Sequence, residues 1–113
     1  TVLEKGELSM MFIHGIYTHT VLKKAKKGDF RVQDDFGGTV HDYNANEDVL
    51  SVGKKIIDAL DHIPMYARVD LLWSKEETLL LSELELIEPE LWFRNQPKAA
   101  EILAHQINEK YFK

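Results

Sequence analysis

Residues Leu79 to Glu90 read LLLSELELIEPE, and the alternation inside this stretch decides how the chain folds. Successive side chains of a β-strand point to opposite faces of a sheet, so Glu83 and Glu85 lie on one face and Leu84 lies on the other. Two carboxylates held about 7 Å apart repel each other unless water or a cation separates them. The stretch therefore predicts a strand with an acidic patch on one face.

A second strand is expected immediately before this one. Residues Tyr66 to Trp73 (YARVDLLW) have the same period, and the polar residues Ser74 to Glu77 turn the chain, which predicts an antiparallel pair. In that pair Arg68 and Asp70 share the face of the two glutamates. Alternation also predicts three apolar residues at the ends of this acidic face: Leu79, Leu81 and Ile87.

The acidic face has two interpretations. Antiparallel sheets often have one solvated face, where acidic residues need no ligand. However, Glu and Asp are poor strand formers, and like charges on neighbouring strands cost stability. Carboxylates between apolar ends are more typical of a divalent-cation site. Hard oxygen ligands suit Mg²⁺ or Mn²⁺, with phosphate oxygens of a ligand completing the coordination shell.

The N-terminal half predicts a hairpin, a short strand and a loop. Residues Glu7 to His14 (ELSMMFIH) and Ile16 to Lys24 (IYTHTVLKK) are typical of two strands joined by a turn at His14-Gly15. Residues Phe30 to Gln33 (FRVQ) suggest a short strand. Residues Asp34 to Asn46 are rich in Gly, Asp and Asn, which predicts a loop.

Two helices are expected. Asn46 suits the N-cap of the first helix, which should end near Asp61 or His62. Pro97 suits the first turn of the second helix, which covers Lys98 to Tyr111. The element order ββ(β)αββα predicts an α+β fold, in which an antiparallel sheet has its helices packed on one face.

Length and composition indicate one domain, residues 1–113, with 44% apolar and 29% charged residues. A net charge of −5 and a pI near 5.5 argue against nucleic acid or an anionic membrane as the main partner. The absence of cysteine fits a reducing cytoplasm, which is the expected localisation. Because Thr1 is not an initiator methionine, we expect the chain to be a piece of a longer protein.

Other candidate features are weaker alone. A lysine cluster follows the hairpin and is typical of a solvated strand end, although any one lysine could bind phosphate: Lys23, Lys24, Lys26 and Lys27. Arg31 and the Gly37-Gly38 pair could approach an anion closely, with a plain turn as the alternative. The five histidines show no metal-ligand spacing, and no Ser-His-Asp set is identifiable.

In this order, the pieces resemble the C-terminal part of an ATP-grasp ligase, a superfamily that includes glutathione synthetase, the ribosomal-protein glutamate ligase and D-alanine–D-alanine ligase. The resemblance rests on ARVD (Ala67 to Asp70), on ELELIEP (Glu83 to Pro89) and on the closing helix. In that family a strand with R-x-D precedes a strand that reads E-x-N, followed shortly by Pro. The segment FRVQDDFGGT (Phe30 to Thr39) is similar to the arginine-and-glycine loop of the glutathione-synthetase branch.

The resemblance implies a Mg²⁺ or Mn²⁺ site. Asp70 and Glu83 would be metal ligands, together with Glu85, which stands where most members of the family have Asn. Arg68 matches an arginine that helps to neutralise the transferring phosphoryl group.

The resemblance also implies an ATP site. Lys23 or Lys24 would contact an ATP phosphate, and Gly37 and Gly38 would lie in a mobile loop nearby. Arg31 would bind the acceptor carboxylate or the acylphosphate.

The implied reaction joins a small-molecule carboxylic acid to an amine, or to a thiol. ATP phosphorylates the carboxylate, and the nucleophile then displaces phosphate from the acylphosphate. The family's substrate domain, lid lysine and adenine hinge would precede Thr1, so we expect the isolated chain to be inactive. The alternative is a non-catalytic module derived from the ATP-grasp fold, which binds a ligand or associates with protein, including self-association into a homo-oligomer.

Overall fold

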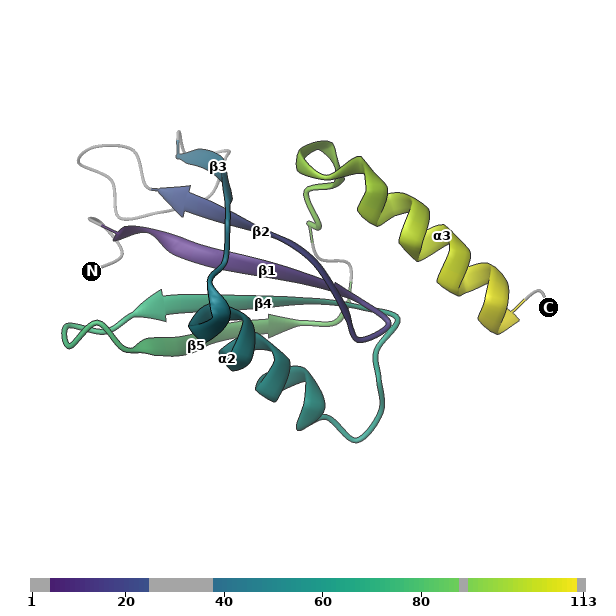
Figure 1. Cartoon of the computed structure of the whole chain (residues 1–113), viewed down its shortest axis with the longest axis horizontal. Coiled ribbons are helices and arrows are strands. Elements are labelled where there is room, and N and C mark those ends of the chain that lie inside the picture. Colours follow the sequence, from purple (N-terminus) through teal and green to yellow (C-terminus); the bar gives the residue numbers. More distant parts are fainter. Residues whose placement is uncertain (1–4, 25–37, 88–89, 112–113) are drawn as a thin grey trace.

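The computed structural model describes residues 5–24, 38–87 and 90–111, and within them five strands form one antiparallel sheet (Figure 1). The strand order across the sheet is β3-β2-β1-β4-β5. The strands are β1 (Glu7–Ile13), β2 (Ile16–Lys24), β3 (Thr39–Tyr43), β4 (Tyr66–Trp73) and β5 (Leu79–Glu85). They are accompanied by the helices α2 (Glu47–Asp58) and α3 (Pro97–Tyr111) and by the short 3-10 helix η2 (Phe93–Asn95). The expected α+β class and antiparallel sheet are confirmed.

The hairpin β1–β2 begins the fold as expected. Both turn residues have positive φ, 48° at His14 and 79° at Gly15, as a two-residue type I′ turn requires. This turn places β1 in the centre of the sheet, where it pairs with both β2 and β4.

The two helices lie on different faces of the sheet, which differs from the expected arrangement with both helices on one face. From β1, Leu8, Met10 and Phe12 pack against α2, whereas Met11 and Ile13 pack on the other face. That second face is covered at one end by a cluster that includes residues of α3 and of the segment before η2: Leu91, Trp92, Ile102 and Leu103. The consecutive apolar residues of β1 are typical of a strand that is buried on both faces.

Helix α2 begins at the expected N-cap. The Asn46 side chain accepts a hydrogen bond from the Val49 N–H at 3.0 Å, and Glu47 and Asp48 occupy the first turn. The helix ends at Asp58, earlier than expected, and the chain bends through residues 59–62 before Pro64. None of the helices in the described ranges is long and apolar enough to cross a membrane.

Strand β3 lies within the predicted loop, so that part of the loop prediction was wrong. Residues Thr39 to Tyr43 (TVHDY) pair with the C-terminal half of β2. Thr, Val and Tyr favour a strand, but the Gly, Asp and Asn residues on both sides dominated the composition. The short strand expected at Phe30 to Gln33 lies outside the described residues.

A β-bulge divides the β4–β5 pair. Asp70 pairs with Glu83 but the next residue, Leu71, pairs with Leu81, so Ser82 is the extra residue. A shift of one residue turns the side chains of β5 that precede the bulge to the opposite face from the one that simple alternation predicts. Leu79 consequently packs in the core beneath α2, and Leu81 lies opposite core residue Leu71. Their expected position on the acidic face was wrong.

Gly6 provides a test of how tightly the start of β1 fits against β2. Its φ is 82°, and a Cβ atom there would lie 2.3 Å from the backbone oxygen of Lys23. Positive φ costs an ordinary residue about 1–2 kcal/mol, and the contact with backbone adds to this cost. We expect Gly6→Ala to lower the free energy of unfolding in urea by at least about 2 kcal/mol.

The matched variant is Gly6→Asn, because Asn tolerates positive φ but carries the same Cβ atom. Both variants should therefore be destabilised. Full stability of Gly6→Asn would show that the close approach to Lys23 does not constrain this position.

Candidate functional site

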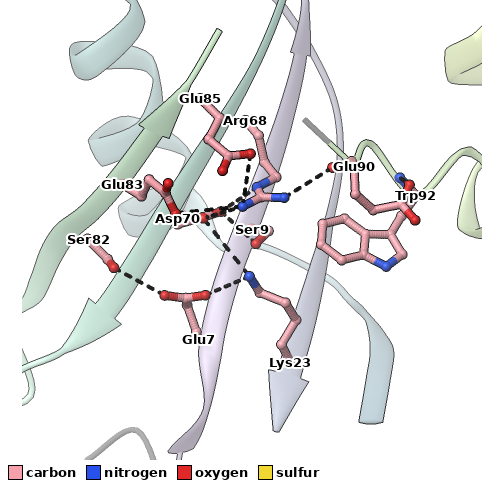
Figure 2. Close-up of polar contacts among 10 residues, drawn as sticks. All are labelled: Glu7, Ser9, Lys23, Arg68, Asp70, Ser82, Glu83, Glu85, Glu90 and Trp92. Atoms are coloured by element: carbon pink, nitrogen blue, oxygen red, sulfur yellow. Dashed lines mark hydrogen bonds and ion pairs between the residues drawn. The ribbon is translucent and has the colours of Figure 1, made fainter. Parts of the chain in front are cut away.

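Charged residues of four strands converge on the sheet face opposite α2 (Figure 2). The register places them there, because Glu7 lies across from Lys23, and Ser9 lies between Val21 on one side and Asp70 on the other. Beyond Asp70, the β4–β5 register adds the two glutamates of β5. We call this group the charged cluster: Glu7, Ser9, Lys23, Arg68, Asp70, Glu83 and Glu85. The predicted gathering of Arg68, Asp70, Glu83 and Glu85 on one face is confirmed.

Asp70 is the centre of the charged cluster and is 1% exposed. The guanidinium of Arg68 donates to both of its carboxylate oxygens, from Nε to Oδ1 at 3.0 Å and from Nη2 to Oδ2 at 2.9 Å. The hydroxyl of Ser9 donates to Oδ1 at 2.6 Å. Paired, two-point hydrogen bonding of this kind is among the strongest that side chains form, and it fixes the plane of the guanidinium.

Arg68 also faces the acidic residues of β5. Its Nη2 lies 3.1 Å from Glu85 Oε2 and 3.8 Å from Glu83 Oε2, and its Nη1 donates to the carbonyl of Glu90 at 3.5 Å. Burial alone would lower the pKa of Arg68, but the hydrogen bonds and charge of Asp70, followed by the charges of Glu85 and Glu83, raise it above its ordinary value. The guanidinium therefore stays charged although its side chain is buried.

Lys23 is the lysine that joins the charged cluster. Its Nζ lies 2.6 Å from Glu7 Oε1 and 4.0 Å from Asp70 Oδ2. The other Glu7 oxygen, Oε2, accepts a hydrogen bond from the Ser82 hydroxyl at 3.1 Å. Lys24, the next residue of β2, points to the other face and is exposed. The geometry therefore separates two lysines between which the sequence could not choose.

Glu83 and Glu85 stand close enough to disturb each other. The pKa of Glu83 is raised by a hydrogen bond with the Glu85 carboxyl, then by burial and by the charges of Glu85 and Asp70. The charged cluster contains four acidic and two basic side chains, so its formal charge is −2 when all are ionised. A divalent cation would neutralise this charge.

The donor set fits such a cation only in part. Glu83 and Glu85 offer carboxylate oxygens at the open side of the charged cluster, with side chains 54% and 29% exposed. Both oxygens of Asp70 are already engaged by Arg68 and Ser9. Among the described residues, no three His, Cys, Asp or Glu side chains are already arranged to hold a metal ion. Asp70 could act as a ligand only if the Arg68 contact at Oδ2 gave way.

Other predicted residues lie elsewhere or outside the described ranges. Gly38 lies directly before β3, whereas Arg31 and Gly37 fall outside the residues that the structure describes. His19 is buried, and its Nε2 is within 3.0 Å of the Leu91 carbonyl and 3.2 Å of the Trp92 carbonyl. These contacts tie β2 to the segment before η2. Burial lowers the pKa of His19 despite the hydrogen bonds.

Sequence reasoning missed three members of the site. Glu7 and Ser9 were treated as parts of a hairpin strand, and Glu7 lies opposite Lys23 only because the β1–β2 register shifts by one residue between Met11 and Phe12. Trp92, whose ring lies over Lys23 and Arg68, lies beyond the end of β5, in a segment for which the sequence predicted no element. No local pattern signals its position.

The different burial of Asp70 and Glu83 predicts opposite responses to loss of charge. Asp70→Asn leaves the buried guanidinium without its two-point partner and should lower the free energy of unfolding by about 3 kcal/mol. A raised carboxyl pKa favours the folded state below the ordinary pKa of 4.5, and this contribution is lost as the pH rises. Glu83→Gln should therefore leave stability at pH 7 unchanged or higher, as measured by urea unfolding without divalent cations. Equal destabilisation by the two variants would contradict this assignment.

Comparison with known proteins places the fold. No protein-family model and no curated protein matches the sequence. Among solved structures, the chain is similar to D-cycloserine synthetase DcsG, an ATP-grasp-type ligase, with a TM-score of 0.78 and 28% sequence identity. The match covers 96% of this chain and 39% of that protein, so the chain spans less than half of its length. The chain therefore has an ATP-grasp-like fold. The similarity supports a relationship to the ATP-dependent ligases at most, and it does not select a branch among them.

Proposed function

We propose that this chain is the phosphate- and metal-binding part of an ATP-dependent ligase that joins a carboxylic acid to an amine or thiol through an acylphosphate. The observation that carries the proposal is the placement of Arg68, Asp70, Glu83 and Glu85 on one sheet face of an ATP-grasp-like fold. In this proposal the chain belongs to the glutathione-synthetase branch, from which Glu85 in place of Asn is a departure.

In the proposed site, Arg68 and Lys23 bind phosphate. Phosphoryl transfer depends mainly on positioning and on neutralisation of negative charge, and both cations are held in place before any ligand arrives. Arg68 is anchored on one side by Asp70, and Lys23 is anchored by Glu7. Because both side chains are largely shielded from water, their attraction for phosphate oxygens is screened less than on an open surface.

The proposed metal ligands are Glu83 and Glu85, with Asp70 as the third when its Oδ2 is released. A bound Mg²⁺ or Mn²⁺ would supply neutralisation of the phosphate charge. The mutual repulsion of the two glutamates supports this role, because a cation between them removes the unfavourable contact. The remaining roles stay predictions: phosphate contact by Gly37 and Gly38 and binding of the acceptor carboxylate or acylphosphate by Arg31.

A second candidate function is a non-catalytic module with the same fold. The observation that favours it is the closed state of Asp70, whose oxygens are satisfied by Arg68 and Ser9 without any cation. A module of this kind would use the charged cluster for stability alone. The two functions therefore differ in whether Glu83 and Glu85 bind a divalent cation.

The metal assignment is tested by titrating Mn²⁺ into the purified chain, with and without ADP, and following free Mn²⁺ by electron paramagnetic resonance. We expect binding that ADP strengthens. Loss of a group that merely supports a ligand already costs about 10- to 100-fold in metal affinity, so Glu83→Gln and Glu85→Gln should each weaken binding at least about tenfold.

Glu76→Gln is the matched control, since Glu76 is an exposed residue of the β4–β5 turn and loses the same charge. It should bind Mn²⁺ as the unaltered chain does. Equal affinity in all three variants would favour the non-catalytic module.

A further inference from the structure

We propose that Trp92 is a positioning residue that holds Lys23 and Arg68 ready for phosphate, an inference that rests on the proposed function. Its ring centroid lies 5.4 Å from Lys23 Nζ and 5.3 Å from Arg68 Cζ. Figure 2 shows the indole beside the two cationic side chains, on the side away from the carboxylates of Asp70, Glu83 and Glu85. One aromatic ring therefore contacts both of the cations that the proposed site uses.

An aromatic ring is suited to this position because it attracts cations without neutralising them. The face of an indole is electron-rich and holds a guanidinium or ammonium group by cation–π attraction, most strongly where water is excluded. A carboxylate in the same place would pair with the cations and compete with phosphate. Trp92 therefore restricts where Lys23 and Arg68 can move without adding a further negative charge beside them.

The backbone at Trp92 is held in an unusual conformation. Its φ and ψ are 48° and 49°, in the left-handed region that a bulky residue rarely adopts. The Trp92 N–H donates to Glu90 Oε2 at 3.1 Å, and the Trp92 carbonyl accepts from the Asn95 N–H at 3.0 Å and lies 3.2 Å from His19 Nε2. Strained conformations persist where surrounding contacts enforce them, and they are concentrated at functional sites.

Packing alone does not explain why this residue is tryptophan. Trp92 is 5% exposed, and its indole Nε1 has no hydrogen-bond partner in the described part of the chain. A buried N–H without a partner costs free energy, which phenylalanine would avoid while still filling much of the space. The larger indole, however, gives the stronger cation–π attraction. Tryptophan therefore holds the two cations more strongly than phenylalanine would, at a cost in the stability of the fold.

The test compares Trp92→Phe and Trp92→Leu with Trp73→Phe. Trp73 is the matched control, because its ring lies 5.9 Å from Lys5 Nζ and it packs on the other face, beneath α2. Binding of inorganic pyrophosphate with Mg²⁺ is measured by calorimetry. Hydrogen exchange of the Arg68 Nε–H is measured by NMR without ligand, and thermal unfolding is recorded for each variant.

Trp92→Leu should weaken pyrophosphate binding about tenfold and accelerate exchange of the Arg68 Nε–H by a similar factor. Trp92→Phe should weaken binding about threefold with an equal or higher unfolding temperature. Trp73→Phe should change neither binding nor exchange. A purely structural role would instead make the Trp92→Phe unfolding temperature fall with no change in Arg68 exchange, and that result would overturn the proposal.

Failure of the proposed function is distinguishable from failure of this inference. If the unaltered chain binds no pyrophosphate with Mg²⁺, the ligase assignment loses its support. Exchange of the Arg68 Nε–H then decides the role of Trp92, since this measurement needs no ligand. Unchanged exchange in Trp92→Leu would show that the ring does not position the guanidinium.

Discussion

The two-point hydrogen bond between Arg68 and Asp70 is the interaction on which the organisation of this sheet face depends. Both side chains are buried, and a buried charge is tolerated only when opposite charges and hydrogen bonds surround it. Ser9 meets this requirement for Asp70 by donating a hydrogen bond, and Glu85 meets it for Arg68 by forming an ion pair. Lys23 and Glu7 extend the same network to β2. The sheet face is thus a set of mutually dependent charges that spans four strands.

The sheet also has to separate this polar face from the apolar core. The alternation of β4 does so, because Val69 and Leu71 face α2 while Arg68 and Asp70 face the other way. Strand β1 combines both requirements, since Ser9 belongs to the charged cluster and Met11 and Ile13 pack with Trp92. One face of the sheet therefore has a polar half and an apolar half, and Trp92 lies where they meet.

Much of this arrangement could be predicted from the sequence, because it follows from short-range periodicity. Residues two apart on a strand share a face, which was enough to gather Arg68, Asp70, Glu83 and Glu85. The N-cap at Asn46 and the turn at Gly15 are equally local. The bulge at Ser82 was not predictable, since the register between two strands depends on contacts across the sheet rather than on either strand alone. The assignment of α3 to the second face likewise required tertiary packing.

Residues brought in by longer-range folding complete the site. The choice between Lys23 and Lys24 needed the β1–β2 register, and Trp92 reaches the cations only because the chain after Pro89 returns over the sheet.

The central claim is that this face binds a divalent cation between the glutamates of β5. The most direct test is a crystal structure of the chain with Mn²⁺ and ADP, using anomalous scattering to locate the metal. The account predicts a manganese peak within about 2.2 Å of oxygens of both Glu83 and Glu85. Manganese bound only elsewhere, with the Arg68 contacts to Asp70 and Glu85 intact, would contradict it.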